Sequence, residues 1–271
     1  MAGPGSFVSV PRHTEHSFVA DEEANLLNFY LPAGFDMFLM GSAVPAQSNA
    51  LPPADTPMPP RALIERLSND YGGMPLTQDR STRPNPDAAA PPAVASAATA
   101  DTYWYAGGRW AVLASGASTG GSYCMFEVIM PRDAGFTPHV RDDVDEVFLV
   151  LDGTADMLLD DRIEAMRQGS MIFAPHGTVA ALRVMSATAR LLVIHTGPGY
   201  ERVLACFGAR ATTSGLPGAD YMPPEISEQR VRNLHAAIGL RQVIVTGAKV
   251  RVVSLHRRAG RGSGRGPTEA G

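Results

Sequence analysis

The chain has 271 residues, of which 45% are hydrophobic and 18% charged, with a formal net charge of −4. This composition predicts a globular protein with one large or two small domains, and it argues against nucleic acid as a partner. The sequence has no apolar run long enough to span a membrane, so no membrane association is expected. The two cysteines, Cys124 and Cys206, do not form a disulfide framework, and we therefore expect reduced thiols and a cytoplasmic protein.

An internal repeat relates the first part of the chain to a later part, at an offset of about 165 residues. Four segments match in the same order, which are Gly5–Pro11 with Gly169–Pro175, Ala24–Leu27 with Ala189–Leu192, Pro32–Phe35 with Gly197–Tyr200, and Met58–Pro60 with Met222–Pro224. Because the offset hardly changes over the four matches, the sequence predicts a duplicated domain.

Each copy is predicted to end in a short amphipathic helix. Apolar residues recur at helical spacing after Pro60 and again after Pro224, and a glycine follows each run, at Gly72 and Gly239. The glycine is expected at the point where each helix ends.

The segments between and after the two copies have distinct compositions. Residues 74–100 are rich in Pro, Ala, Ser, Thr and Asp, which predicts a disordered linker. Residues 101–245 contain short apolar segments separated by turn sequences, which is typical of a complete antiparallel barrel followed by a helix. The strands are expected at residues 110–114, 123–129, 146–151, 155–159, 169–174, 179–184 and 190–196. Residues 246–271 are predicted to be a basic, flexible tail.

The first copy is shorter than the second. Residues 1–73 match only the second half of a barrel and its helix, because the strands expected from about residue 103 to residue 168 have no counterpart before Gly5. A half barrel leaves strand edges open, so we expect the natural chain to begin further upstream. The alternative is a remnant domain that packs against the complete barrel.

Two segments of the second copy carry the candidate site. Thr137–Gly153 holds His139, a run of acidic residues, Glu146 and an apolar strand that ends in Asp-Gly, and Gly169–Gly177 holds an apolar strand followed by Pro-His-Gly. Imidazole nitrogen and carboxylate oxygen are ligands that suit Fe(II), Mn, Ni or Cu. Residues two apart on a strand share one face, so such a strand can direct two ligands to one metal ion.

These segments resemble the two motifs of the cupin superfamily. With the repeat and the segment Pro32–Phe35, the chain from Gly3 to about Gly239, apart from the linker, resembles a bicupin similar to quercetin 2,3-dioxygenase-like proteins. The resemblance implies an all-β fold, a duplicated cupin-type jelly-roll barrel (double-stranded β-helix) with short helices after each copy. It also implies a homodimer and the cleavage of a flavonol ring by dioxygen at a divalent metal.

The resemblance also assigns candidate ligands. His139 and Glu146 match ligand positions in the second copy, with Glu146 also able to act as a catalytic base, and His16 matches one in the first copy. Arg141 and Ala180 stand where two further histidines are expected. A guanidinium group cannot bind a metal ion, so an Arg141–Glu146 ion pair is the simpler expectation. His176 and His195 are expected to lie out of phase with the ligands. His176 is expected in a loop, and His195 is expected to be a hydrogen-bonded polar residue on a strand and not a ligand.

Three functions are compatible with the sequence. The first is a metal-dependent oxygenase that acts on a flavonoid-like or other small aromatic metabolite. The second is a metal-free module that binds a small apolar ligand inside the barrel, among Met125, Phe126, Phe148 and Met157 or their neighbours. The third is a structural barrel that stabilises a dimer. A nucleophilic enzyme is not expected, since neither cysteine has a neighbouring histidine and no Gly-x-Ser-x-Gly motif occurs.

Overall fold

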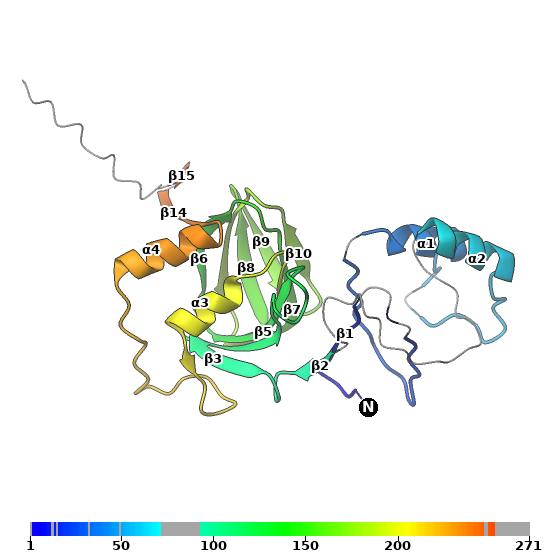
Figure 1. The fold of residues 1–271 in the computed structure, drawn as a ribbon, viewed down its shortest axis with the longest axis horizontal. Helices are drawn as coiled ribbons and strands as arrows, with labels where there is room; N and C mark the ends of the chain where they lie inside the picture. The colour runs from blue at the N-terminus through cyan, green and yellow to red at the C-terminus, as the bar shows by residue number, and fades with distance from the viewer. Residues whose placement is uncertain are drawn as a thin grey trace, which may run out of the picture. The chain divides into compact units, whose positions relative to one another are not determined.

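The chain was analysed as a computed structural model that describes residues 2–11, 14, 16–31, 33–48, 50–71, 93–246 and 249–252. It divides into two units, of which the smaller comprises residues 10–91 and the larger comprises residues 1–9 and 92–271 (Figure 1). None of the helices in these ranges is both long and apolar enough to cross a membrane.

The larger unit contains a barrel of two antiparallel sheets. The strand order is β10-β7-β12-β5-β4-β3-β13 in one sheet and β15-β14-β6-β11-β8-β9 in the other. From β5 to β12 the chain passes repeatedly from one sheet to the other, which is the topology of a jelly roll and confirms the predicted fold class. The strands are β3 (Asp101–Tyr105), β4 (Gly108–Ala114), β5 (Cys124–Pro131), β6 (Gly135–Arg141), β7 (Glu146–Asp152), β8 (Thr154–Leu159), β9 (Arg162–Arg167), β10 (Met171–Ala174), β11 (Val179–Val184), β12 (Thr188–His195), β13 (Ala209–Arg210), β14 (Leu240–Thr246) and β15 (Lys249–Val252).

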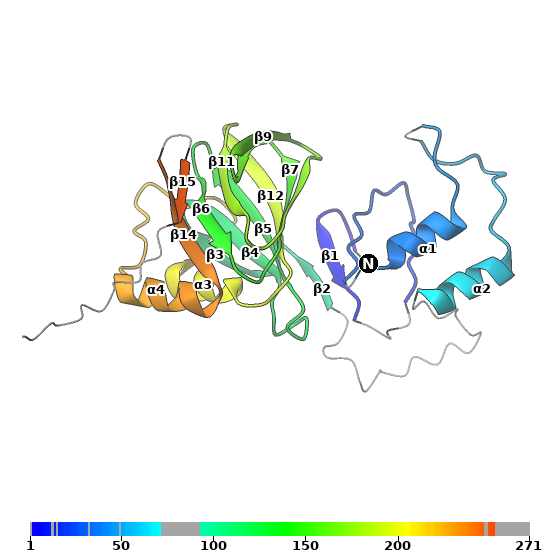
Figure 2. The same cartoon turned by 90° about the horizontal axis from the view of Figure 1, so that it is seen from above.

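Alternate residues of these strands fill the interior of the barrel. Trp110 is fully buried, and its ring stacks on Tyr200 and meets Phe126 and Phe136 edge to face. Two helices, α3 (Tyr200–Phe207) and α4 (Glu228–Ala237), lie side by side next to the barrel and contribute Val203, Leu204, Phe207 and Leu234 to the same core (Figure 2). The helix predicted after Pro224 is therefore α4.

The smaller unit contains two helices in its described residues, α1 (Phe35–Ser42) and α2 (Arg61–Asp70). A side-chain atom at Gly41 would collide with Leu67, so the two helices touch where glycine allows a close approach. The second of them is the helix predicted after Pro60.

The two copies of the repeat share the same local backbone conformation at matched glycines. Gly34 precedes α1 with a φ of 134°, and its counterpart Gly199 precedes α3 with a φ of 117°. Gly5 and Gly169 likewise have φ values of 78° and 82°, and a strand follows each of them. Because a positive φ favours glycine, these matched positions preserve the same backbone turn in both copies.

Among the described residues of the half barrel predicted for residues 1–73, a single strand occurs, β1 (Ser6–Ser9). Its antiparallel partner is β2 (Ala93–Ser96), which lies within the segment predicted to be a disordered linker. Residues 24–27, which match part of β12, are not in a strand. A strand requires a neighbour to satisfy its backbone groups, and no strand equivalent to β5 or β7 pairs with this segment in the part of the chain that the structure describes.

Some strands of the barrel are absent from the sequence-based prediction. Strand β9 was missed because only Met166 of its six residues is buried, so it lacks an apolar run. Residues 249–252, predicted to be part of the flexible tail, form β15 against β14. The rest of the predicted linker and tail, residues 74–92 and 253–271, lies outside the described residues, as does most of the His13–Glu15 segment.

Candidate functional site

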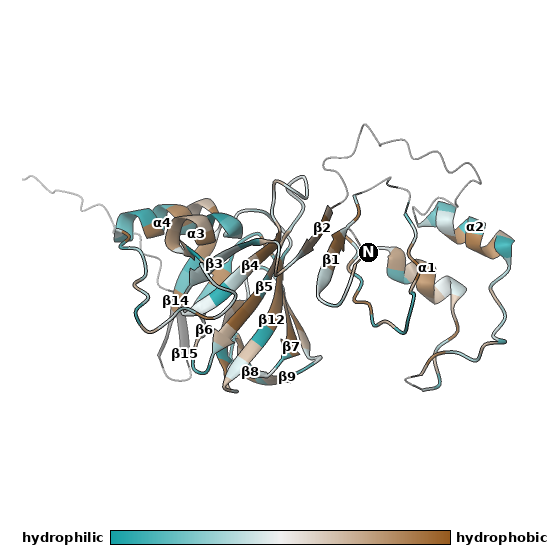
Figure 3. Cartoon of the chain, turned by 90° about the horizontal axis from the view of Figure 1, so that it is seen from below, coloured by the Kyte–Doolittle hydropathy of each residue, from teal (hydrophilic) through white to brown (hydrophobic). Residues whose placement is uncertain are grey.

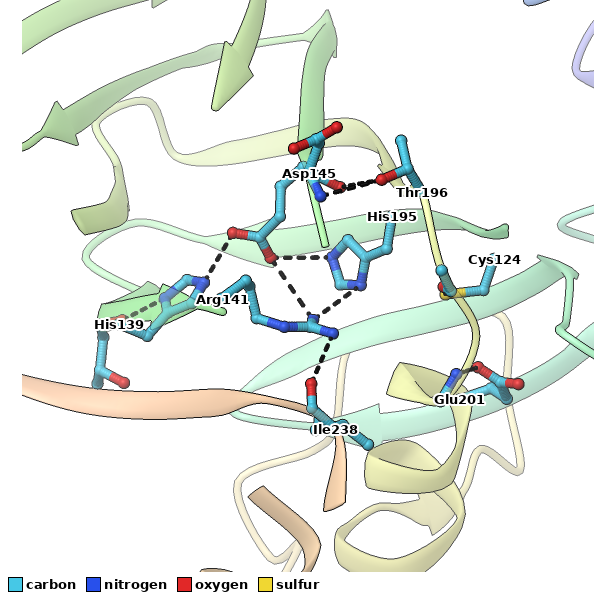
Figure 4. Close-up of polar contacts among 12 residues, drawn as sticks. Cys124, His139, Arg141, Asp145, His195, Thr196, Glu201 and Ile238 are labelled. Carbon is cyan, nitrogen blue, oxygen red and sulfur yellow. Dashed lines mark hydrogen bonds and ion pairs between the residues drawn. The ribbon is translucent and has the colours of Figure 1, made fainter. Parts of the chain in front are cut away.

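Four polar side chains converge inside the barrel, and we call them the polar cluster: His139, Arg141, Glu146 and His195. The first two lie two residues apart on β6, Glu146 begins β7, and His195 ends β12 directly opposite Glu146 (Figure 4). All four are between 2% and 6% exposed. Charged groups this deeply buried are stable only when they are paired with one another.

His139 donates from both ring nitrogens. Its Nε2 lies 3.0 Å from Glu146 Oε2, and its Nδ1 lies 2.8 Å from the carbonyl oxygen of Thr137. A carbonyl oxygen and a carboxylate can only accept, so both nitrogens carry a proton and the ring is an imidazolium. Burial lowers the pKa of His139, but the hydrogen bond to Glu146 and the charge of that carboxylate outweigh burial, and the pKa is raised.

His195 is held as a neutral ring. Its Nε2 lies 3.2 Å from Glu146 Oε1, and its Nδ1 lies 3.4 Å from Arg141 Nη1. The guanidinium can only donate, so Nδ1 accepts and Nε2 carries the proton. Burial lowers the pKa of His195 to about 3, and the neighbouring cations add to this effect against the opposing charge of Glu146.

Arg141 is the fixed cation of the cluster. Its Nη1 lies 3.9 Å from Glu146 Oε1, and its Nη2 donates to the carbonyl oxygen of Ile238 at 3.1 Å. The predicted ion pair is therefore confirmed. Burial raises the pKa of Glu146, but His139, His195 and Arg141 together lower it to about 2, so the carboxylate stays ionised. With two cations and one anion, the cluster has a net charge of +1.

The residues of the cluster do not fit a divalent metal. Nδ1 of His139 faces the Thr137 carbonyl oxygen and Nε2 faces Glu146, so a metal ion would have to displace the proton between His139 and Glu146 and break that contact. The guanidinium of Arg141 lies beside Glu146 and His195, where it would repel a second cation. Within the described ranges, no three His, Cys, Asp or Glu side chains are arranged as a metal-binding group.

A cavity of about 10 Å³ adjoins the cluster. Its walls are three members of the polar cluster together with Trp110, Phe136, Phe148, Val193 and Tyr200. This volume is about that of one water molecule, whereas pockets for organic ligands measure roughly 300–1,000 Å³. This cavity therefore has no room for an aromatic ligand.

The other residues singled out in the sequence lie outside the cluster. Ala180 is directly opposite His139 on β11, at the position where the resemblance implied a ligand, and it offers no donor atom. His176 is exposed and pairs with Asp145 at 2.8 Å. His16 belongs to the smaller unit, where its Nδ1 lies 2.9 Å from the Thr14 carbonyl oxygen.

Two expectations about the barrel interior were wrong. His195 was expected to be out of phase with the ligands, but it lies on the same face of β12 as Leu191 and Val193, and its Nε2 lies 3.2 Å from Glu146 Oε1. The alternation of apolar residues along β12 was the signal that could have placed it there. Met125 was expected to line the interior with Phe126, but adjacent residues of a strand point to opposite faces, and only Phe126 joins the central core.

From the pKa shifts of the cluster, we expect the free energy of unfolding to be greatest near pH 6.5. The folded-state pKa values of His195 and Glu146 are depressed to about 3 and about 2, so their contribution is present above their unfolded values of 6.5 and 4.5. That contribution is lost as the pH falls toward 2. The raised pKa of His139 acts in the opposite sense, and its contribution is lost as the pH rises through the folded value.

Urea unfolding at a series of pH values checks this expectation. His195→Gln is expected to reduce the decline in the free energy of unfolding between pH 6.5 and pH 3, because glutamine does not titrate. Thr212→Gln is the control, because position 212 is exposed and neither residue titrates, so the profile is expected to stay unchanged. A wild-type profile that is flat from pH 6.5 to pH 3 would contradict the assigned protonation states.

Solved structures to which the chain is similar include three proteins of modest likeness. The Schizosaccharomyces pombe Cnp3 cupin domain is 16% identical, and the match covers 42% of this chain and 81% of that one, with a TM-score of 0.35. KdgF from Halomonas sp. is 17% identical over 36% of this chain and 87% of that one, with a TM-score of 0.33. A predicted oxalate decarboxylase from Thermotoga maritima is 13% identical. The match covers 37% of this chain and 96% of that one, with a TM-score of 0.36.

No protein-family model matches the chain, and neither does any curated protein. The assignment of a jelly roll accordingly rests on the strand order, and the roles of the residues rest on the geometry of the polar cluster.

Proposed function

We propose that the barrel is a metal-free cupin-type module with a structural role, in which the guanidinium of Arg141 takes the place of a metal ion. The observation that carries this proposal is the contact of Arg141 with both Glu146 and His195 inside the barrel. An internal cation compensates the buried carboxylate, so the carboxylate needs no bound metal ion as a counter-charge. The small cavity further supports a structural role over the binding of a ligand in the interior.

The competing proposal is a quercetin 2,3-dioxygenase-like oxygenase that acts on a flavonoid-like substrate. It requires a divalent metal on His139 and Glu146 and space for an aromatic ring beside them. The protonated His139, the adjacent Arg141 and the cavity of about 10 Å³ all count against it in this barrel. No observation on the described residues favours it over the metal-free module.

Metal content distinguishes the two proposals. We expect the full chain, incubated with Fe(II), Mn(II), Ni(II) or Cu(II) and then desalted, to retain far less than one metal ion per chain by mass spectrometry. Arg141→His is the matched comparison, because it removes the cation and adds an imidazole on the face of β6 that already carries His139. This variant is expected to retain metal, and the further change Glu146→Gln is expected to abolish that retention.

The oxygenase proposal makes the opposite prediction. Stoichiometric metal in the wild-type chain that Glu146→Gln removes, together with consumption of a flavonol and dioxygen, would overturn the metal-free assignment. Metal that is retained equally by wild type and Glu146→Gln is bound outside the cluster and leaves the assignment standing.

A further inference from the structure

The segment that follows helix α4 lies along the polar cluster. Residues 238–242, which we call the strap, lead from α4 into β14. The strap pairs antiparallel with β6, so that Leu240 lies opposite Arg141 and Gln242 lies opposite His139. Within the described part of the chain, β14 is the neighbour of β6 on the side away from β11. The strap therefore covers the edge of the strand that carries two members of the cluster.

A guanidinium group joins the strap to the cluster. Arg141 Nη2 donates to the carbonyl oxygen of Ile238 at 3.1 Å, and Nη1 of the same group lies 3.9 Å from Glu146 Oε1 (Figure 4). The side chain is 1% exposed, and its Nε has no hydrogen-bond partner among the described residues. A buried guanidinium needs partners for its donors, so its position depends on both Glu146 and the strap.

Other polar contacts of the strap are closer to solvent. The carbonyl oxygen of Gly239 accepts from the backbone N–H of Asp142 at 2.8 Å, and Arg241 pairs with the carboxylate of Asp142 at 2.7 Å. The two side chains of this ion pair are 42% and 47% exposed, and such pairs contribute little stability. Among these contacts, the hydrogen bond from Arg141 is the buried one, where water does not compete.

The segments on both sides of the strap are loosely anchored. Only Leu234 of α4 is buried, and Figure 3 shows hydrophilic residues, in teal, over much of this helix. Residues 211–227, which precede it, contain neither helix nor strand. Beyond the strap, the buried Val243 fixes β14 in place. Segments that bury few apolar residues open at a lower free energy than the core, so the strap can separate from the barrel at its Ile238 end.

The closed position of the strap depends on close approaches at two glycines. Gly239 has a φ of 62°, and a side-chain atom there would collide with the carboxylate of Asp143. A Cβ atom at Gly199 would lie 3.0 Å from Ile238 Cγ2. The residue after Gly199 is Tyr200, which lines the cavity beside the polar cluster. The side chain of Ile238 therefore packs next to the wall of that cavity.

We propose that residues 238–242 are a strap that opens and closes over the polar cluster, and that Arg141 holds it closed. Opening breaks the hydrogen bond from Arg141 to Ile238 and brings water to the guanidinium group and to the wall of the cavity. Solvation of buried charges favours opening, and the hydrogen bond opposes it. The proposal concerns access to the cluster, so it is independent of the role proposed for the barrel.

Amide hydrogen exchange of the full chain tests this proposal. The Asp142 amide reports on the strap, because it donates to Gly239, and the amides of β12, between β5 and β7, report on the core. We expect Arg141→Met to lower the protection factor of Asp142 by about 10- to 100-fold more than those of β12, as for the loss of a hydrogen bond from a charged group. Because both are measured in one variant, a loss of overall stability affects them alike.

Arg109→Met is the matched control. Arg109 is also buried, it donates to the carbonyl oxygen of Ala97 at 2.7 Å, and its Nε likewise has no partner among the described residues. It lies on β4 of the other sheet, so its replacement is expected to leave the protection of Asp142 relative to β12 unchanged. A loss of relative protection as large as in Arg141→Met would contradict the role given to Arg141.

Gly239→Ala is a second variant that leaves every member of the polar cluster in place. It strains the turn into the strap, so it is also expected to lower the protection of Asp142 relative to β12. Circular dichroism establishes that each variant is folded, and Gly239→Ala decides the test if Arg141→Met unfolds. Equal losses of protection at Asp142 and in β12 would mean that the strap opens only when the whole barrel unfolds, and would overturn the proposal.

Discussion

Replacing Glu146 with glutamine is expected to lower the free energy of unfolding by about 3–5 kcal/mol, the cost of leaving a buried charge without its partner. Glu146 lies within 4 Å of His139, Arg141 and His195, and it is the only anion among them. Glutamine has nearly the same shape, so the loss is electrostatic and not steric. Arg141 cannot release its proton, and its charge remains in the core.

A double-mutant cycle measures this coupling. Adding Arg141→Met to Glu146→Gln removes both permanent charges, and the double variant is expected to be more stable than Glu146→Gln alone. Chemical unfolding of the four proteins at pH 7 provides the data. Asp133→Asn is the control, because the Asp133–Arg183 pair is largely exposed and contributes at most about 1 kcal/mol.

The opposite result has a clear meaning. If Glu146→Gln changes the free energy of unfolding by no more than Asp133→Asn, the carboxylate does not compensate Arg141 in the folded protein. If the two substitutions prove additive, the cluster is not a coupled unit. Either outcome would remove the physical basis for a guanidinium that replaces a metal ion.

Replacing Trp110 with alanine is expected to cost about 3–5 kcal/mol through the loss of buried surface and the cavity that is left. The ring is fully buried and contacts Phe126, Phe136 and Tyr200, and its Nε1 donates to the Tyr105 carbonyl oxygen at 3.1 Å. Trp110 also lines the existing cavity, so the variant would enlarge that space toward the polar cluster.

Indole provides a second measurement on the same variant. A ligand that binds only the folded state raises the melting temperature, so indole is expected to stabilise Trp110→Ala and to leave the wild type unaffected. Trp104→Ala is the control, since Trp104 is partly exposed and its Nε1 reaches the Gly215 carbonyl oxygen near the surface. A wild-type melting temperature that rises with indole would show that the interior accepts an aromatic ligand and would contradict the structural role.

Much of the candidate site could be predicted from local sequence. His139 and Arg141 are two residues apart on one strand, so the two-residue period of a strand already places them on one face. A buried arginine needs an anion, and Glu146 at the start of the next strand supplies it. The repeat could also be predicted from the sequence. The turns before α1 and α3 both require glycine at a positive φ, so the same residue type occurs at the matched positions.

Other features depended on which strands become neighbours. His195 is far from Glu146 along the chain and meets it only through the register of β7 and β12. Ala24–Leu27 resembles part of β12, yet it forms no strand, because strand formation depends on partners that this segment lacks.

The sequence by itself determined the jelly-roll class, the residues available to the site and the loss of two expected ligands at Arg141 and Ala180. The jelly-roll class and the two lost ligands follow from the resemblance to the cupin motifs, and the chemistry of the available residues follows from single side chains. Both are visible in local sequence. Only the tertiary structure decided the hydrogen-bond partners of His139, the contact of His195 with Glu146 and the volume of the cavity. It also decided the exposure of Met171 and Phe173 on β10. Each of these depends on distances between residues that are remote in sequence, and strand pairing sets those distances.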